Sequence, residues 1–126
     1  MKKIIATKNA PAPIGPYNQA VLSGETLYIS GQIPIDPVTG NLVQGDIAKE
    51  TKQSMENLKA ILTEAEMTFE NVVKSSIFIS DMNQFSKINA VYATYFNTET
   101  APARETVEVA NLPKFVNVEI SMIAVK

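Results

Sequence analysis

The sequence predicts an α+β fold in which one mixed β-sheet carries two helices packed on one of its faces. Two amphipathic helical patterns and several short segments of alternating apolar and polar residues indicate this class. The predicted order of elements is β-β-β-α-β-α-β-β. A chain of 126 residues can bury one core and is too short for two ordinary domains, so we expect a single domain over residues 1–126.

The N-terminal part of the sheet is expected to contain a hairpin. Residues 19–23 and 26–32 read as strands, and the segment Ser23-Gly24-Glu25 between them is typical of a turn. Leu27 and Ile29 alternate with polar or aromatic neighbours, which is typical of a strand with one buried face.

Two helices are predicted from apolar residues that recur every three or four positions. The first begins after the capping residue Asp46 and runs to about Glu66. The second runs from about Gln84 to Phe96, with Asn83 as its cap. The apolar faces comprise Ile47, Thr51, Met55, Leu58, Leu62 and Ala65 in the first helix, and Phe85, Ile88, Tyr92 and Tyr95 in the second.

Three further strands are predicted over residues 72–80, 103–110 and 116–125, and the last two are expected to form a pair. In the first of these, Val73, Ile77 and Ile79 are expected on one side and Lys74, Ser76, Phe78 and Ser80 on the other. In the last, the apolar row Val116, Val118, Ile120, Met122 and Ala124 should lie under the helices.

Applied to the strand at 103–110, the same alternation of apolar and polar residues predicts that Val107 and Val109 point toward the helices. Arg104, Thr106 and Glu108 are then expected on the opposite, helix-free face. Glu119 is expected on that face too. Further residues there are Tyr28, Phe78, Ile123 and Val125. A scatter of apolar residues on a wet surface is one explanation of this mixture, and a subunit interface is the better one.

Composition excludes several classes of chemistry. The chain has no Cys and no His, which excludes disulfides, thiolate nucleophiles, Cys/His zinc sites and a Ser-His-Asp triad. No acidic cluster has the spacing of a magnesium site, so no metal is expected. The net charge of −2 and the lack of a basic block argue against nucleic acid binding. No segment has the length or character of a membrane span or signal peptide, so a cytoplasmic location is expected.

Four stretches of the chain carry a resemblance to a known family. They are IGPYNQA at 14–20, SGQIPIDPVTG at 30–40, PARETVEVANLP at 102–113 and VEI at 118–120. The chain resembles, over essentially its whole length, the RidA/YjgF family of enamine/imine deaminases. The arginine segment followed at this spacing by the glutamate of VEI is the most specific of the four motifs.

The resemblance implies a fold like that of the bacterial chorismate mutase of the α+β type, and homotrimers with a cleft at each subunit boundary. Members of the family hydrolyse 2-aminoacrylate, 2-aminocrotonate and their imine tautomers to 2-keto acids and ammonia. These species leak from PLP-dependent serine and threonine dehydratases. The family uses no cofactor.

The resemblance also implies roles for individual residues. Arg104 matches the arginine that binds the substrate carboxylate, and Glu119 matches the acid that orients the attacking water. The expected substrate-binding residues are Tyr17, Ser30, Gly31, Asn89 and Thr106, with Gly31 and Thr106 acting through backbone groups. The sequence departs from the family at Glu105, where a small residue is common, and at Thr106, which is often Cys. An acid at 105 is expected to lie beside the arginine and either to weaken anion binding or to alter the choice of substrate.

Each assignment has a simpler alternative. Arg104 could pair with Glu108 or another surface acid, and Glu119 could be a solvated strand residue. Lys74 is expected to be an ordinary charged residue. At the level of function, a non-catalytic sensor of keto acids or amino acids would use the same arginine cleft without needing Glu119. RNA cleavage is a third reading, which the net charge and the absence of His disfavour.

Overall fold

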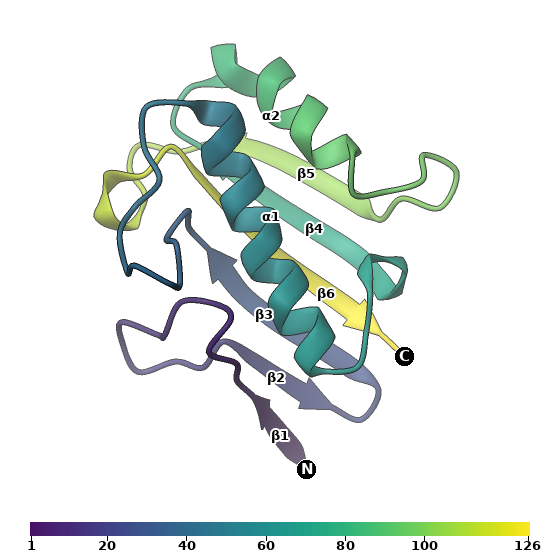
Figure 1. Cartoon of the computed structure of the whole chain (residues 1–126). Helices are drawn as coiled ribbons and strands as arrows, with labels where there is room; N and C mark the ends of the chain where they lie inside the picture. The colour runs from purple at the N-terminus through teal and green to yellow at the C-terminus, as the bar shows by residue number, and fades with distance from the viewer.

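The computed structural model describes residues 1–126 and contains one six-stranded sheet with both α-helices on the same face (Figure 1). The predicted fold class and order of elements are therefore confirmed. The strands are β1 (Lys2–Ile5), β2 (Ala20–Ser23), β3 (Thr26–Gln32), β4 (Val72–Ile79), β5 (Ala103–Glu108) and β6 (Val118–Val125), and the helices are α1 (Ile47–Glu64) and α2 (Phe85–Ala93).

The strands lie in the order β1-β2-β3-β6-β4-β5. All neighbours are antiparallel except β4 and β5, which are parallel and are connected through α2. The two final strands, expected to form a pair, are not neighbours, because β4 lies between β5 and β6. β5 is consequently an edge strand with one side free.

The long helix α1 begins as predicted. The Asp46 side chain accepts hydrogen bonds from the backbone N–H groups of Ala48 and Lys49. The predicted start of α2, near Gln84, is confirmed to within one residue, but its predicted cap is wrong. Asp81 caps the short 3-10 turn (Met82–Gln84) that leads into the helix, and Asn83 caps nothing. Neither helix combines the length and the hydropathy that crossing a bilayer requires.

The core lies between the helices and the sheet. Leu58 and Ile61 of α1 pack in one buried cluster with Ile77 of β4 and Ile120 of β6. A second, smaller cluster comprises Ile33, Ile35, Leu112 and Val116. Val116 is thus buried, but it belongs to this second cluster and not to the row under the helices, since β6 begins only at Val118.

A β-bulge in β4 corrects the face assigned to Val73. Val72 pairs with Ala124 and Lys74 pairs with Ile123, so Val73 is an extra residue opposite a continuous partner strand. Val72 is buried and Val73 is 49% exposed. Simple alternation fails here because the bulge shifts the register by one residue.

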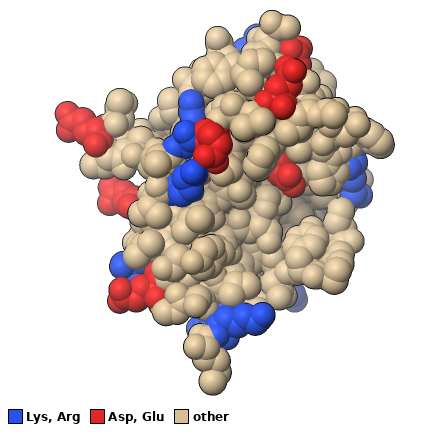
Figure 2. Space-filling view, turned by 180° about the vertical axis from the view of Figure 1, so that it is seen from behind, with Lys and Arg blue, Asp and Glu red and all other residues tan.

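The sheet face opposite the helices is open. Tyr28, Phe78, Ile123 and Val125 lie on it, as predicted, and all four are partly or largely exposed. Figure 2 views the molecule from behind and shows that uncharged residues cover most of this side. A face of this composition is typical of a surface that a protein partner covers.

Candidate functional site

Arg104 lies on the helix-covered side of the sheet, at its open edge. It pairs in register with the buried Ser75 of β4, and paired residues of neighbouring strands point to the same face. Its guanidinium donates a hydrogen bond of 2.7 Å to the side-chain oxygen of Asn89 on α2. The guanidinium carbon is 5.7 Å from the ring centre of Phe85 and 5.0 Å from that of Tyr92. The predicted placement of Arg104 on the helix-free face is wrong.

No acidic side chain neutralises Arg104 within the chain. The single salt bridge joins Lys74 to Glu105, with 2.7 Å between the ammonium and a carboxylate oxygen. Glu108, the expected surface partner, instead accepts a hydrogen bond from the backbone N–H of Met82. The guanidinium therefore retains donor groups for an external anion, and its planar fork suits a carboxylate.

Buried polar contacts hold the environment of Arg104. The Tyr92 hydroxyl donates to the Ser75 hydroxyl at 2.8 Å. Burial raises the pKa of Tyr92 above its ordinary value, although the Ser75 hydrogen bond and the nearby Arg104 charge oppose that shift. Tyr92 thus stays a neutral, fixed ring against which the arginine packs.

Thr106 lies two residues further along β5 and shares the helix-covered face. It pairs with the buried Ile77, and its hydroxyl oxygen is buried without a hydrogen-bond partner. An unpartnered buried hydroxyl is costly unless something binds it. Arg104, Asn89 and Thr106 form what we call the arginine half-site.

Glu119 lies on the opposite, open face. It pairs with Phe78 of β4, between the core residues Val118 and Ile120. The side chain is half-buried, and burial raises the pKa of its carboxyl above the ordinary value. A carboxylate in this state is a better proton acceptor than one in water.

A glycine makes room for this carboxylate. A Cβ atom at Gly31 would lie 2.7 Å from the carboxyl carbon of Glu119, which is closer than real Cβ atoms approach. Ser30 and Gly31 fall in an irregularity of the β3–β6 pairing between Ile29 and Gln32. Any side chain at position 31 would displace Glu119.

Tyr17 and Ser30 lie close to this glycine. Tyr17 and Gly31 line the same small cavity of about 20 Å³, and the Tyr17 ring is 46% exposed. The Ser30 hydroxyl donates to the backbone oxygen of Asn18 at 2.6 Å. Glu119 together with Gly31, Tyr17 and Ser30 forms what we call the acid half-site.

The two half-sites do not meet within one chain. Arg104 points to the helix-covered face from the edge strand, and Glu119 points to the open face from β6, with β4 between them. Alternation placed Arg104 wrongly because Val107 was taken as the inward residue of β5. Val107 is 42% exposed on the open face, where it pairs with Phe78.

Glu105 is also not where the sequence placed it. It accepts hydrogen bonds from Lys74 and Ser76, both on the open face of β4. The Lys74 contact, followed by that of Ser76, lowers the pKa of the Glu105 carboxyl. Its charge is matched locally and lies on the other face of the sheet from Arg104.

Sequence reasoning missed the two aromatic residues against the arginine. Phe85 and Tyr92 were assigned only to the apolar stripe of α2, and Asn89 lies between them at helical spacing. That spacing puts all three on one face, which was the available signal. No group of three or more acidic residues is arranged to hold a metal ion.

The similarity to known proteins agrees with the motifs. Residues 7–126 match the family model described as Endoribonuclease L-PSP. A RutC family protein of Pyrococcus horikoshii is 54% identical over 126 residues, covering 100% of this chain and 99% of the relative. The chain belongs to the RidA/YjgF family.

Other relatives carry more specific names. The 2-iminobutanoate/2-iminopropanoate deaminase of Bos taurus is 50% identical over 126 residues, covering 100% of this chain and 91% of the relative. A crystal structure of Escherichia coli TdcF with bound serine has a TM-score of 0.92 at 44% identity, covering 98% of each chain. This RidA/YjgF chain thus has the chorismate mutase-like fold of its family.

Proposed function

We propose that the protein is a 2-iminobutanoate/2-iminopropanoate deaminase whose active site forms between two copies of the chain. The observation that carries this proposal is the separation of the two half-sites. Arg104 is an unneutralised cation on one face, and Glu119 is a half-buried carboxylate on the other. If the β5 edge of one copy lay against the open face of a neighbouring copy, Arg104 of the first would come close to Glu119 of the second.

The proposed assembly is a homotrimer. A closed ring of three copies repeats one heterologous contact three times, so each boundary would hold one arginine half-site and one acid half-site. The mostly uncharged open face supports this assembly, since it would otherwise leave Tyr28 and Val107 in water.

In the proposed reaction, Arg104 binds the carboxylate of the 2-imino acid through two parallel hydrogen bonds while Asn89 holds the guanidinium in place. Glu119 accepts a proton from a water molecule, whose oxygen attacks the electrophilic iminium carbon. The new C–O bond gives a carbinolamine. Glu119 then gives the proton to the amine. As the C–N bond breaks, the hydroxyl proton passes back to Glu119 and the C=O bond forms, so that a 2-keto acid and ammonia leave, and Glu119 finally releases its proton to solvent. No covalent nucleophile is required, because water supplies the oxygen.

The remaining residues of the half-sites would position the substrate. Gly31 and Thr106 would offer backbone groups, and Tyr17 and Ser30 would border the side of the cleft that Glu119 occupies. The Thr106 hydroxyl is already buried within the chain, so the contact proposed for this residue is made by its backbone on the free edge of β5. The substrate would come from PLP-dependent serine or threonine dehydratases, which points to a cytoplasmic role.

The test is a coupled reaction. A threonine dehydratase generates the imine, and the decay of the imine and the appearance of 2-ketobutyrate are followed with and without this protein. Faster imine decay supports the deaminase. Unchanged decay together with tight 2-ketobutyrate binding would support the carboxylate sensor, and cleavage of an RNA probe would support the activity in the family description.

A further inference from the structure

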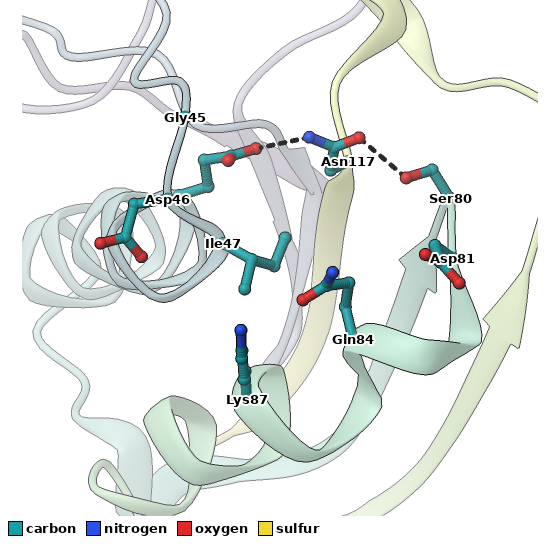
Figure 3. A pocket seen from close by; sticks show the side chains of 9 residues that line it. Gly45, Asp46, Ile47, Ser80, Asp81, Gln84, Lys87 and Asn117 are labelled. Carbon is teal, nitrogen blue, oxygen red and sulfur yellow. Dashed lines mark hydrogen bonds between the residues drawn. The ribbon is translucent and has the colours of Figure 1, made fainter.

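A polar cavity of about 530 Å³ lies on the helix side of the molecule, apart from both half-sites. It is bordered by the start of α1, the turn after β4, α2 and the residue before β6 (Figure 3). Ile47 is the one apolar residue in its lining. None of the residues of the arginine half-site or the acid half-site contributes to it.

A buried carboxylate forms part of the cavity wall. Glu50, in the first turn of α1, is 3% exposed and accepts a hydrogen bond of 3.1 Å from the Asn117 side chain. Asn117 in turn accepts a hydrogen bond of 2.8 Å from the Ser80 hydroxyl. Figure 3 labels Asn117 and Ser80 and marks both hydrogen bonds of Asn117 with dashed lines. This chain of contacts fixes the orientation of Glu50 and leaves its second carboxylate oxygen without a partner.

The charge of Glu50 has no cation beside it, since the chain's single salt bridge joins Lys74 to Glu105. The N-terminal end of α1 offsets part of the cost of burying that charge. The Asn117 contact holds the carboxylate in one orientation, so a cation that enters the cavity can form a charge-assisted hydrogen bond to the free oxygen without first having to order the side chain.

An ammonium group borders the same space without contacting Glu50. Lys87 extends from α2 toward the region below Ile47 and makes no salt bridge (Figure 3). Asp46 and Asp81 border the cavity too, and each uses one carboxylate oxygen to cap a helical turn. Three carboxylates against one ammonium favour a ligand with a positive group, and Lys87 favours one that also carries a negative group.

We propose that this cavity is a second ligand site, which binds a small α-amino acid as its zwitterion. The amino acid's ammonium contacts the free oxygen of Glu50, and its carboxylate faces Lys87. A metal ion does not fit, because no three acidic residues are arranged to coordinate one. The site is independent of the deaminase proposal, since it shares no residue with that reaction.

The test is an NMR titration of the ¹⁵N-labelled full chain carrying Arg104→Ala, which silences the proposed carboxylate site. The probes are L-2-aminobutyrate, propylamine without the carboxylate, and butyrate without the ammonium. L-2-aminobutyrate should shift the amide signals of Gly45, Ser80 and Asn117, and should bind about tenfold more tightly than either partial probe.

Two variants locate the contacts. Glu50→Gln keeps an acceptor for Asn117 and removes the charge, so affinity should fall roughly 10- to 100-fold. Lys87→Met should abolish the preference for L-2-aminobutyrate over propylamine, and this exposed position tests the proposal even if Glu50→Gln folds poorly. Lys49→Met, an exposed lysine outside the cavity, is the control. Equal binding of all three probes, or undiminished binding to Glu50→Gln, would overturn the proposal.

Discussion

The helix-covered face and the open face of the sheet carry opposite chemical functions. On the covered face, Arg104 is held by Asn89 and two aromatic rings, and its charge is unneutralised. On the open face, Glu119 is half-buried, burial raises the pKa of its carboxyl, and no cation lies beside it. One chain thus keeps a complementary pair of charges apart on two faces of its sheet, and in the assembly proposed above a second copy joins them.

The largest effect is expected from the arginine. Arg104→Ala should abolish imine hydrolysis in the coupled dehydratase assay, because nothing else in the half-site can bind a carboxylate. The fold should persist, since Arg104 lies on an edge strand and is not part of the buried core. Lys49→Ala removes an exposed lysine and serves as the control. Parental hydrolysis by Arg104→Ala would place the reaction elsewhere.

Arg104→Lys refines the same prediction. Lysine keeps the charge but loses the two-pronged geometry, and loss of one charge-assisted hydrogen bond costs about 1.5–3 kcal/mol. The affinity for 2-ketobutyrate, measured by calorimetry, should therefore fall roughly 10- to 150-fold. Unchanged affinity would mean that the ligand is held by charge alone.

The open-face residue should act on turnover more than on binding. Glu119→Gln keeps the shape of the side chain and removes the base, so kcat should fall roughly 10²- to 10⁴-fold while 2-ketobutyrate binding persists. Calorimetry and the coupled assay measure the two quantities separately. If both kcat and the affinity for 2-ketobutyrate stay at parental values, a group other than Glu119 must activate the attacking water.

The fold was predictable to the extent that it depends on local periodicity. The stripe from Met55 to Leu62 and the alternation of Leu27 and Ile29 determine which residues share a face, and the structure confirms both. The facing of β5 was not predictable, because alternation does not say which of two faces is inward. That choice depends on β4 lying between β5 and β6.

The faces on which the residues of the proposed site lie also depend on nonlocal strand pairing, so the sequence did not reveal all of them. The bulges at Val73 and at Ser30-Gly31 change the register without any local sequence signal as strong as the alternation itself. The motifs were enough to name the residues of the proposed site. They did not show that these residues lie on two different faces of the sheet, since that depends on nonlocal strand pairing.

The pH dependence of kcat/KM should follow the ionisation of Glu119. The base must be ionised to accept a proton, so kcat/KM should rise with pH and level off above the pKa of Glu119, which burial raises. Below that pKa the rate should fall by about tenfold per pH unit. Rate measurements from pH 4 to 8 test this, and Glu119→Gln should lack this acid limb. A flat parental profile would contradict the role of Glu119 as base.

Mixing two inactive variants tests whether the site is shared between chains. Arg104→Ala supplies intact acid half-sites and Glu119→Gln supplies intact arginine half-sites. Refolding an equal mixture should restore about a quarter of parental activity, since one boundary in four then joins two intact halves in a cyclic assembly. Each variant refolded alone is the control. No recovery would mean that each active site is made by one chain.

The smallest effect is expected from substitution of Glu105, whose position in the structure differs from the one that the sequence predicted. The sequence placed this acid beside Arg104, so Glu105→Ser would then tighten binding of a 2-keto acid. In the structure, Glu105 is paired with Lys74 and Ser76 on the open face, and its charge is neutralised there. An exposed pair of this kind has little influence across the sheet, so 2-ketobutyrate affinity should change by less than about twofold. Calorimetry at low and high salt measures this, with Glu64→Ser as an acid-removing control on α1. A clear gain in affinity at low salt, absent from the control, would mean that assembly carries Glu105 of one copy close to Arg104 of the next.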